Sequence, residues 1–244
     1  MKFHLTIGGC VKKFFTLLFV SILFAGNTFA GGFQTGTQNA RAMGMGSAFV
    51  GMVADASAIY FNPAGLANIR GFNLVVGTTF IMPTVDFTGP KPLTTKTSTE
   101  KRTFTPINLY AAYAMDNGFS FGVGVYNPYG LGSEWNNNWI GKALAVKTDL
   151  KTFYINPTVS YKFTNDFSLG LGFIYIISDV GMSRRITSVP GVPVPTNIMS
   201  DLTGNGNAVS FSAGLLYKPL QDLSVGVSYR HSAEVEYEGE VSFS

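Results

Sequence analysis

Few side chains in this sequence are of the kinds that catalyse reactions. Beyond residue 30, His231 is the only histidine, so a Ser-His mechanism would have one candidate base, and no recognisable nucleophile motif accompanies it. The single cysteine, Cys10, lies before that point, which excludes disulfides and cysteine-ligated metals from the remainder. No cluster of histidines and carboxylates has the spacing of a metal site. We therefore expect no catalysis, no metal and no other cofactor.

Four carboxylates recur at a spacing of two residues near the end of the sequence. This spacing places side chains on one face of a β-strand. The row would consist of Glu234, Glu236, Glu238 and Glu240. Calcium binding is one interpretation of such a row, and a solvated face is the interpretation that we prefer.

The residues suited to binding are basic or apolar. Arg184 and Arg185 could attract the carboxylate headgroup of a ligand, although a basic pair at a strand end is also typical of a contact with lipid headgroups or solvent. Two segments that we expect to be loops are unusually apolar, and exposed apolar patches often mark binding sites. One contains Trp135, Trp139, Ile140 and Leu144, and the other contains Val189, Val192, Val194, Ile198 and Met199. The alternative is that these side chains pack on one another or on interfacial lipid.

The first 30 residues have the features of a secretory signal. Lys2, Lys12 and Lys13 form a positive region, residues 14–24 an apolar core, and Thr28-Phe29-Ala30 a cleavage site. The apolar core is shorter than the about 20 residues that a transmembrane helix needs. Three of the 17 Lys and Arg lie in this signal, so the remaining 14 equal the 14 Asp and Glu in number. A neutral mature chain gives no support to nucleic-acid binding, which requires a basic patch.

The apolar residues of the mature chain alternate with polar ones. Only 13% of the residues are charged, against about 25% in ordinary soluble domains. Between residues 151 and 163 the alternation is regular, and it predicts a strand with one apolar and one polar face. The apolar face would carry Phe153, Ile155, Val159 and Tyr161, and the polar face Thr152, Asn156, Thr158 and Ser160.

This period predicts seven strands whose connections alternate in length. The strands cover residues 72–86, 104–115, 119–126, 151–163, 167–178, 209–217 and 223–243, with short turns at 116–118, 164–166 and 220–222 and long loops at 86–103, 127–149 and 184–207. Short turns on one side and long loops on the other are typical of outer-membrane barrels. A soluble β-sandwich or lipocalin-like barrel is the alternative, but its outer face would be polar. We predict an all-β fold, an antiparallel transmembrane β-barrel.

The number of strands also bears on completeness. If the N-terminus is periplasmic, the seventh strand ends outside, whereas bacterial single-chain barrels normally have an even number of strands. We therefore expect the 244 residues to be the N-terminal part of a longer barrel.

Several motifs follow the signal in a definite order. Gly32-Phe33-Gln34 comes first, then the run from Ala40 to Gly51, and then Tyr60-Phe61-Asn62-Pro63-Ala64-Gly65-Leu66. Together they resemble the N-terminus of the FadL/TodX family of outer-membrane transporters of hydrophobic compounds. The likeness continues through Asn127-Pro128-Tyr129-Gly130-Leu131 and Tyr229-Arg230, and so covers essentially the whole mature chain.

The resemblance implies a 14-stranded barrel, half of which is present here, with a small helical hatch. The hatch would occupy residues 31–70 and the barrel strands residues 71–244, after the signal at 1–30. Asn62, Pro63, Ala64 and Gly65 would belong to the gating part of the hatch. Asn62 suits a helix N-cap and Pro63 the first helical position, so a short helix should begin there.

A second motif, Asn127-Pro128-Tyr129-Gly130, follows the third expected strand. Proline lacks the donor that pairs strands, and glycine weakens pairing. The resemblance implies that these residues kink the strand and open a lateral gap in the barrel wall. The alternative is that they begin the outer loop.

We expect a monomeric protein of the bacterial outer membrane whose partners are long-chain fatty acids or other hydrophobic small molecules, together with outer-membrane lipid. The resemblance implies passive transport, in which ligand is gathered by outer loops, enters an apolar lumen and leaves laterally after the hatch rearranges. The alternatives are uptake of aromatic hydrocarbons, a non-transporting surface barrel for adhesion or assembly, and a diffusion porin. The plug-like N-terminus argues against the porin.

Overall fold

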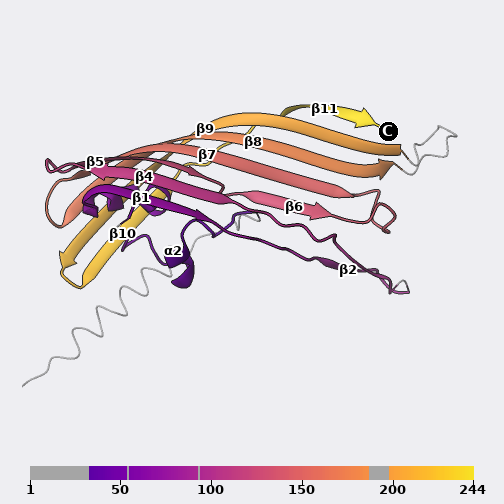
Figure 1. Ribbon diagram of the computed structural model, residues 1–244, viewed down its shortest axis with the longest axis horizontal. Coiled ribbons are helices and arrows are strands. Elements are labelled where there is room, and N and C mark those ends of the chain that lie inside the picture. Colours follow the sequence, from indigo (N-terminus) through magenta and orange to yellow (C-terminus); the bar gives the residue numbers. More distant parts are fainter. Residues whose placement is uncertain (1–32, 54, 93, 187–197) are drawn as a thin grey trace, which may run out of the picture. The chain divides into compact units, whose positions relative to one another are not determined.

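The computed structural model describes residues 33–53, 55–92, 94–186 and 198–244, and most of them lie in one antiparallel sheet (Figure 1). The strands of this sheet follow the order β1-β4-β5-β7-β8-β9-β10. They are β1 (Gly71–Thr78), β4 (Ile107–Ala114), β5 (Phe119–Tyr126), β7 (Lys147–Lys162), β8 (Phe167–Ile186), β9 (Ile198–Leu220) and β10 (Leu223–Arg230). A separate hairpin joins β2 (Asp86–Thr88) to β3 (Lys96–Ser98) inside the first expected loop.

Two further strands continue others beyond an interruption. β6 (Gly130–Glu134) pairs with β7 past the end of β5, and β11 (Glu238–Phe243) pairs with β9 past the end of β10. The nine strands of this sheet therefore occupy seven positions, which confirms the predicted number. None of the helices in the described ranges is long and apolar enough to cross a membrane.

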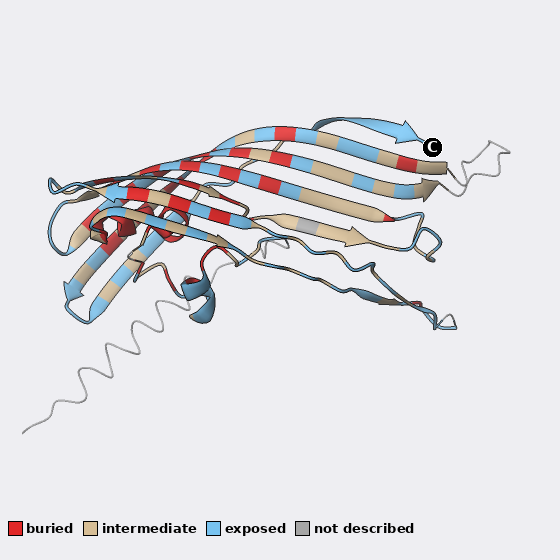
Figure 2. Ribbon diagram, viewed as in Figure 1, coloured by how far each residue is buried: buried red, intermediate tan, exposed pale blue. Residues whose placement is uncertain are grey.

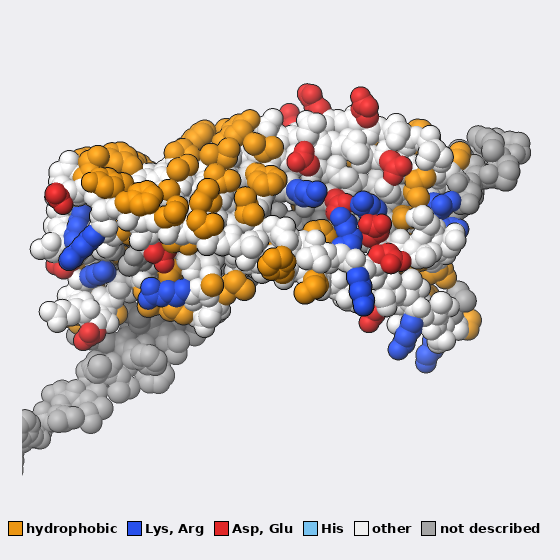
Figure 3. All heavy atoms as spheres, in the orientation of Figure 1, with side chains coloured by type: hydrophobic (Ala, Val, Ile, Leu, Met, Phe, Trp, Pro, Cys, Tyr) orange, Lys and Arg blue, Asp and Glu red, His pale blue; other side chains and the backbone are white. Residues whose placement is uncertain are grey.

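The two faces of the sheet reverse the arrangement of a soluble protein. Leu171, Phe173 and Val209 point outward with 53–61% of their surface exposed, whereas Ser178 and Ser210 point inward and are buried. Alternating burial along β7, β8 and β9 is visible in Figure 2, and exposed apolar side chains cover much of the outer face in Figure 3. An outer surface of this kind suits lipid rather than water.

Several strands extend further than the alternation of apolar residues predicts. β8 continues to Ile186 and β9 begins at Ile198, so Ile198 and Met199, expected in a loop, lie in a strand instead. β7 likewise begins at Lys147, inside the loop expected over 127–149. The outward positions of these extensions are polar, so the alternation of apolar and polar residues ends before the strands do. Val189, Val192 and Val194 lie outside the described residues.

The seventh predicted strand is broken, contrary to expectation. β10 ends at Arg230 and pairing with β9 resumes only at Glu238. Between them Ala233 and Val235 pack against the buried core, and Tyr237 makes a 2.7 Å hydrogen bond to Ser178 on the inner face. Because this segment turns inward, the predicted row of four carboxylates on one strand does not form. Only Glu238 and Glu240 share a strand.

Residues 33–70, for which we keep the name hatch, pack on the inner face of the sheet. The hatch contains α2 (Ala40–Gly44), α3 (Ala58–Phe61) and the 3-10 helix η1 (Pro63–Asn68). η1 contacts β7, β8 and β9. Side chains of the hatch and of inward-facing wall residues form one apolar core, which includes Phe49, Ile59, Phe61, Leu66, Tyr110, Tyr126, Ile174 and Ile176.

Candidate functional site

Asn62 joins the hatch to the wall of the sheet. Its side chain is fully buried, and Oδ1 accepts a 3.1 Å hydrogen bond from the Ala64 N–H at the start of η1. Its Nδ2 donates to the carbonyl oxygens of Val50 in the hatch (2.9 Å) and Leu215 in β9 (3.0 Å). The predicted N-cap at Asn62 and the helix start at Pro63 are therefore confirmed. The gating role of these residues stays a prediction.

The wall approaches η1 closely because two of its inward positions are glycines. A Cβ atom at Gly214 would lie 2.1 Å from Asn62 Oδ1, and one at Gly170 would lie 2.3 Å from the Pro63 carbonyl carbon. Any larger residue would push η1 off the wall. Both glycines lie at inward positions of predicted strands, and this placement is the signal that sequence reasoning did not use.

Polar wall side chains bind the backbone of the same part of the hatch. Ser160 and Ser168 both donate to the Ala64 carbonyl oxygen, at 3.4 and 3.0 Å. Further bonds of this kind are Asn156 Nδ2 to Ile59 O, Ser224 Oγ to Gly51 O, and Ala56 N to Asn73 Oδ1. Each one satisfies a polar backbone group of the hatch, which would be costly to bury alone.

The wall is interrupted where Asn127-Pro128-Tyr129 separates β5 from β6. Tyr126 lies opposite Tyr154 and Gly130 opposite Lys151. The three residues between the strands therefore face only the two residues 152 and 153 of β7. One extra residue is a β-bulge, which bends the strand and disrupts pairing.

These residues do not simply begin the outer loop, because the strand resumes at β6 and the loop begins only at residue 135. We call the interruption the kink, and its role as a lateral opening stays a prediction. Asn127 holds both sides of the kink: Oδ1 accepts from Ile107 N–H (2.9 Å) and Nδ2 donates to Thr152 O (2.6 Å). Whether ligand leaves through this kink stays a prediction.

The first residues of the hatch occupy the kink. Gln34 forms an antiparallel β-bridge with Tyr129. The hydrogen bonds are Thr35 N to Pro128 O (2.8 Å), Gly130 N to Phe33 O (3.2 Å) and Gln38 Nε2 to Asn127 O (2.8 Å). Backbone groups that strand pairing leaves free at the kink are thus bound by the hatch. We call residues 33–38 the bridging strip.

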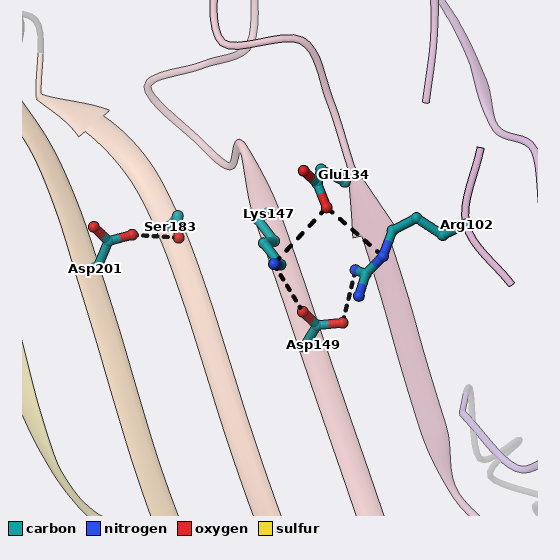
Figure 4. A network of polar contacts seen from close by, with 6 residues as sticks. All are labelled: Arg102, Glu134, Lys147, Asp149, Ser183 and Asp201. Atoms are coloured by element: carbon teal, nitrogen blue, oxygen red, sulfur yellow. Dashed lines mark hydrogen bonds and ion pairs between the residues drawn. The ribbon is translucent and has the colours of Figure 1, made fainter. Parts of the chain in front are cut away.

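Beyond the bridging strip, β6 is covered by the Phe104 ring and by a network of ion pairs around Arg102. The Phe104 ring lies over Gly132, where an added Cβ atom would be 2.0 Å from the ring. Close by, Arg102 pairs with Asp149 (2.7 Å) and Glu134 (3.6 Å), and Lys147 completes the network at 3.8 Å from Glu134 and 3.7 Å from Asp149 (Figure 4). The Arg102 network therefore ties the segment before β4 to β6 and β7. Its members are far apart in sequence, so no local pattern identifies it.

The Trp residues of the first apolar segment pack mainly on each other. Trp135 and Trp139 stack with centroids 4.2 Å apart, Trp139 meets Phe87 edge-on, and its Nε1 donates to Ala145 O. This arrangement favours mutual packing for the Trp pair. Ile140 and Leu144 remain 52% and 81% exposed, as a ligand-gathering surface requires.

The remaining candidate residues lie on the sheet or directly after one of its strands. Arg184 and Arg185 are near the end of β8, Arg184 is exposed, and the Arg185 N–H donates to Lys142 O. His231 follows β10 and stacks on Phe211 with ring centroids 4.9 Å apart. Neither position is part of the contacts between hatch and kink described above.

Several known proteins are similar to this chain in sequence. A 26% identical relative is a long-chain fatty acid transport protein of Escherichia coli O6:H1, aligned over 91% of this chain and 55% of its own length. The 47 kDa outer membrane protein of Pasteurella multocida is 27% identical over 95% of this chain and 57% of its own. The chain thus spans about half the length of these relatives.

Solved structures share the fold. A Pseudomonas aeruginosa FadL homologue superposes with a TM-score of 0.63 at 22% identity, over 82% of this chain and 52% of the other. The toluene transporter TodX of P. putida gives 0.55 at 15% identity, over 77% and 57%. The sheet therefore corresponds to part of a FadL-like barrel.

The family model described as outer membrane protein transport protein (OMPP1/FadL/TodX) matches residues 21–244. The chain belongs to this family of outer-membrane transport proteins.

Proposed function

We propose that this protein transports hydrophobic molecules passively across the outer membrane, with long-chain fatty acids as its main substrates. The observation that carries the proposal is the contact between the bridging strip and the kink. A molecule that avoids water gains nothing from a water-filled pore, and a route from the lumen through the wall into lipid suits it better. The bridging strip lies across such a route, so its release would open the wall to lipid.

The choice of substrate rests on the relatives and on the surfaces available. Several relatives are named long-chain fatty acid transport proteins, while one structural neighbour is a toluene transporter. Exposed Ile140 and Leu144 provide an apolar landing surface, and exposed Arg184 provides a positive charge for a carboxylate. Aromatic hydrocarbons are the second candidate because they need similar apolar contacts but no charge.

The test is uptake of radiolabelled oleate and toluene by cells that produce the protein and by cells that do not. We expect saturable oleate uptake that depends on the protein, and its loss in Asn62→Ala/Pro63→Ala with unchanged amounts of folded protein in the outer membrane. Normal uptake by this variant would reject the gating role.

Two further measurements separate the other functions. Uptake of toluene without uptake of oleate would favour an aromatic hydrocarbon channel. Steady ion conductance in planar bilayers would indicate a diffusion porin. Normal cell-surface display without uptake of either compound would favour a role in adhesion or assembly.

A further inference from the structure

We propose that a hollow on the lipid-facing side of the wall binds one acyl chain of a membrane phospholipid. The hollow is bordered by outward-facing side chains of β5, β7, β8 and β9, and its volume is about 660 Å³. It lies on the opposite face of the sheet from the hatch. This contact with the membrane is independent of the substrate that the protein carries.

Long apolar side chains surround the hollow, and a short one lies among them. The long side chains, each 46–61% exposed, are those of Phe121, Leu171, Phe173 and Phe211. Pro157 in β7 lies between them, and its compact ring leaves space that a longer side chain would fill. Ligand sites typically have volumes of about 300–1,000 Å³, so the hollow is large enough to hold part of an acyl chain.

Pairing between β7 and β8 is interrupted at the hollow. β7 pairs with β8 on both sides of this gap in one register, but among the described residues Asn156 and Pro157 have no partner in β8. Both residues stay paired with β5. The register places Pro157 opposite Phe173, and proline has no N–H to donate to the Phe173 carbonyl oxygen. The two strands are therefore joined less firmly here than elsewhere along their length.

Polar side chains gather on the inner side of the same gap. The Cβ atom that Gly172 lacks would lie 2.6 Å from Ser212 Oγ, 2.7 Å from Asn156 Oδ1 and 3.0 Å from Thr158 Oγ1. Ser212 is 2% exposed, and its hydroxyl has no hydrogen-bond partner within the part of the chain that the structure describes. A weakly paired stretch of wall thus separates polar groups from hydrocarbon, where unsatisfied polar groups are costly. An apolar body in the hollow closes this stretch from the outside.

The position of the hollow determines what fills it. It is continuous with the apolar outer face, which meets acyl chains in a membrane barrel. Lipid provides no hydrophobic driving force, so binding there depends on van der Waals packing. A chain in the hollow gains contacts on several sides, whereas a chain on a smooth face gains them on one. No charged residue lines the hollow, so it offers no partner for the carboxylate of a free fatty acid, and phospholipid chains are the molecules that surround it.

The test is photo-cross-linking of the protein in nanodiscs. The bilayer contains a low mole fraction of a phosphatidylethanolamine with a diazirine on one acyl chain, and labelled residues are identified by mass spectrometry. We expect labelling to concentrate on the side chains that line the hollow. Tyr175 and Val209 also face outward but do not line it, and they should be labelled less. Labelling in proportion to exposure alone would overturn the proposal, because it would indicate ordinary contact with bulk lipid.

Variants of the lining test the site itself. Phe211→Ala should lower labelling of Leu171 and Phe173 about threefold to tenfold, as the loss of one aromatic contact does. Pro157→Phe should lower it as well, because the larger ring occupies the hollow. Tyr175→Ala, on the same face of β8, is the matched control and should leave labelling unchanged. Heat-modifiable gel mobility checks that each variant forms a folded barrel. Unchanged labelling in folded Phe211→Ala and Pro157→Phe would contradict the assignment.

Competition distinguishes a phospholipid from a free fatty acid. Unlabelled phosphatidylethanolamine, added at increasing mole fraction in a background of phosphatidylcholine, should reduce labelling of the hollow, and oleate at the same mole fraction should reduce it less. Stronger displacement by oleate would assign the hollow to free fatty acids and overturn its assignment to a phospholipid chain.

Discussion

The two ends of the hatch are attached to the wall in different ways. At one end, Asn62 is fully buried and its side chain makes three hydrogen bonds, two of them within the hatch and one to β9. At the other end, the bridging strip begins with Phe33, which is 51% exposed, and it binds the kink through backbone hydrogen bonds and through the side chains of Thr35 and Gln38. Local stability follows burial and contact density. We therefore expect the bridging strip to be the end that leaves while the rest stays.

The parts of the wall that the two ends contact also differ in regularity. The buried end rests on regular strands, where glycines and serines fit its backbone. The bridging strip rests on an interruption, where it replaces pairing that a continuous strand would supply for itself. The proposed gating needs one fixed end and one exchangeable end, and four experiments test this division.

The largest effect on uptake is expected from a covalent link between the bridging strip and the kink. Opposed residues of an antiparallel bridge have Cα atoms about 4.5–5.5 Å apart, within the range that a disulfide spans. Gln34→Cys/Tyr129→Cys should therefore cross-link under oxidising conditions and abolish uptake, and reduction should restore it. Residues 31–244 contain no cysteine, so each single variant is a control for the pair. Full uptake by the oxidised protein would show that the strip need not move.

Removing the hydrogen bonds of Asn62 at the buried end should have the next largest effect on uptake. Asn62→Ala leaves the buried Ala64 N–H and the partly buried carbonyl groups of Val50 and Leu215 without this partner, at a cost of about 1–3 kcal/mol. We expect a lower urea midpoint for release of the hatch and a loss of gated uptake. Asn165→Ala, in an exposed turn, is the matched control. Equal midpoints for the two variants would contradict the anchoring role.

A change in the wall alone should give a similar but smaller effect. Gly214→Ala places a methyl group 2.1 Å from Asn62 Oδ1 and 2.9 Å from Pro63 Cδ, and overpacking of this kind costs about 1–3 kcal/mol. We expect faster proteolysis of the hatch. Gly181→Ala on the neighbouring strand, where the nearest atom would be 3.9 Å away, should behave like the wild type.

The smallest effect on stability is expected from the ion pairs of the Arg102 network. Its side chains are partly exposed, Arg102 by 24% and Asp149 by 19%, and ion pairs of this kind are worth about 1 kcal/mol or less. A double-mutant cycle with Arg102→Gln and Asp149→Asn should give a coupling energy in that range that falls with added salt. A coupling energy well above about 1 kcal/mol would show that these ion pairs also hold the kink together on its outer side.

Local features of this fold could be predicted from the sequence. Alternation identifies strands because it reports which side chains meet lipid, and Asn62-Pro63 identifies a helix start because a capping bond spans two residues. Pro128 and Gly130 likewise indicate an interruption. Contacts between distant segments could not be predicted. The bond from Thr35 to Pro128 joins residues 93 positions apart, and the inward turn at Ala233 and Val235 depends on a core that only the fold assembles.

The bulge before β6 has a consequence for how this wall can change over time. Three residues face two at Asn127-Pro128-Tyr129. The interruption therefore depends on one additional residue as well as on the types of residue present. Loss of the single codon for Pro128 would remove both the surplus residue and the missing donor, and Phe119 to Glu134 could then pair with β7 without a break. One in-frame deletion would thus turn the interrupted strand into a continuous one, whereas point substitutions leave the surplus residue in place.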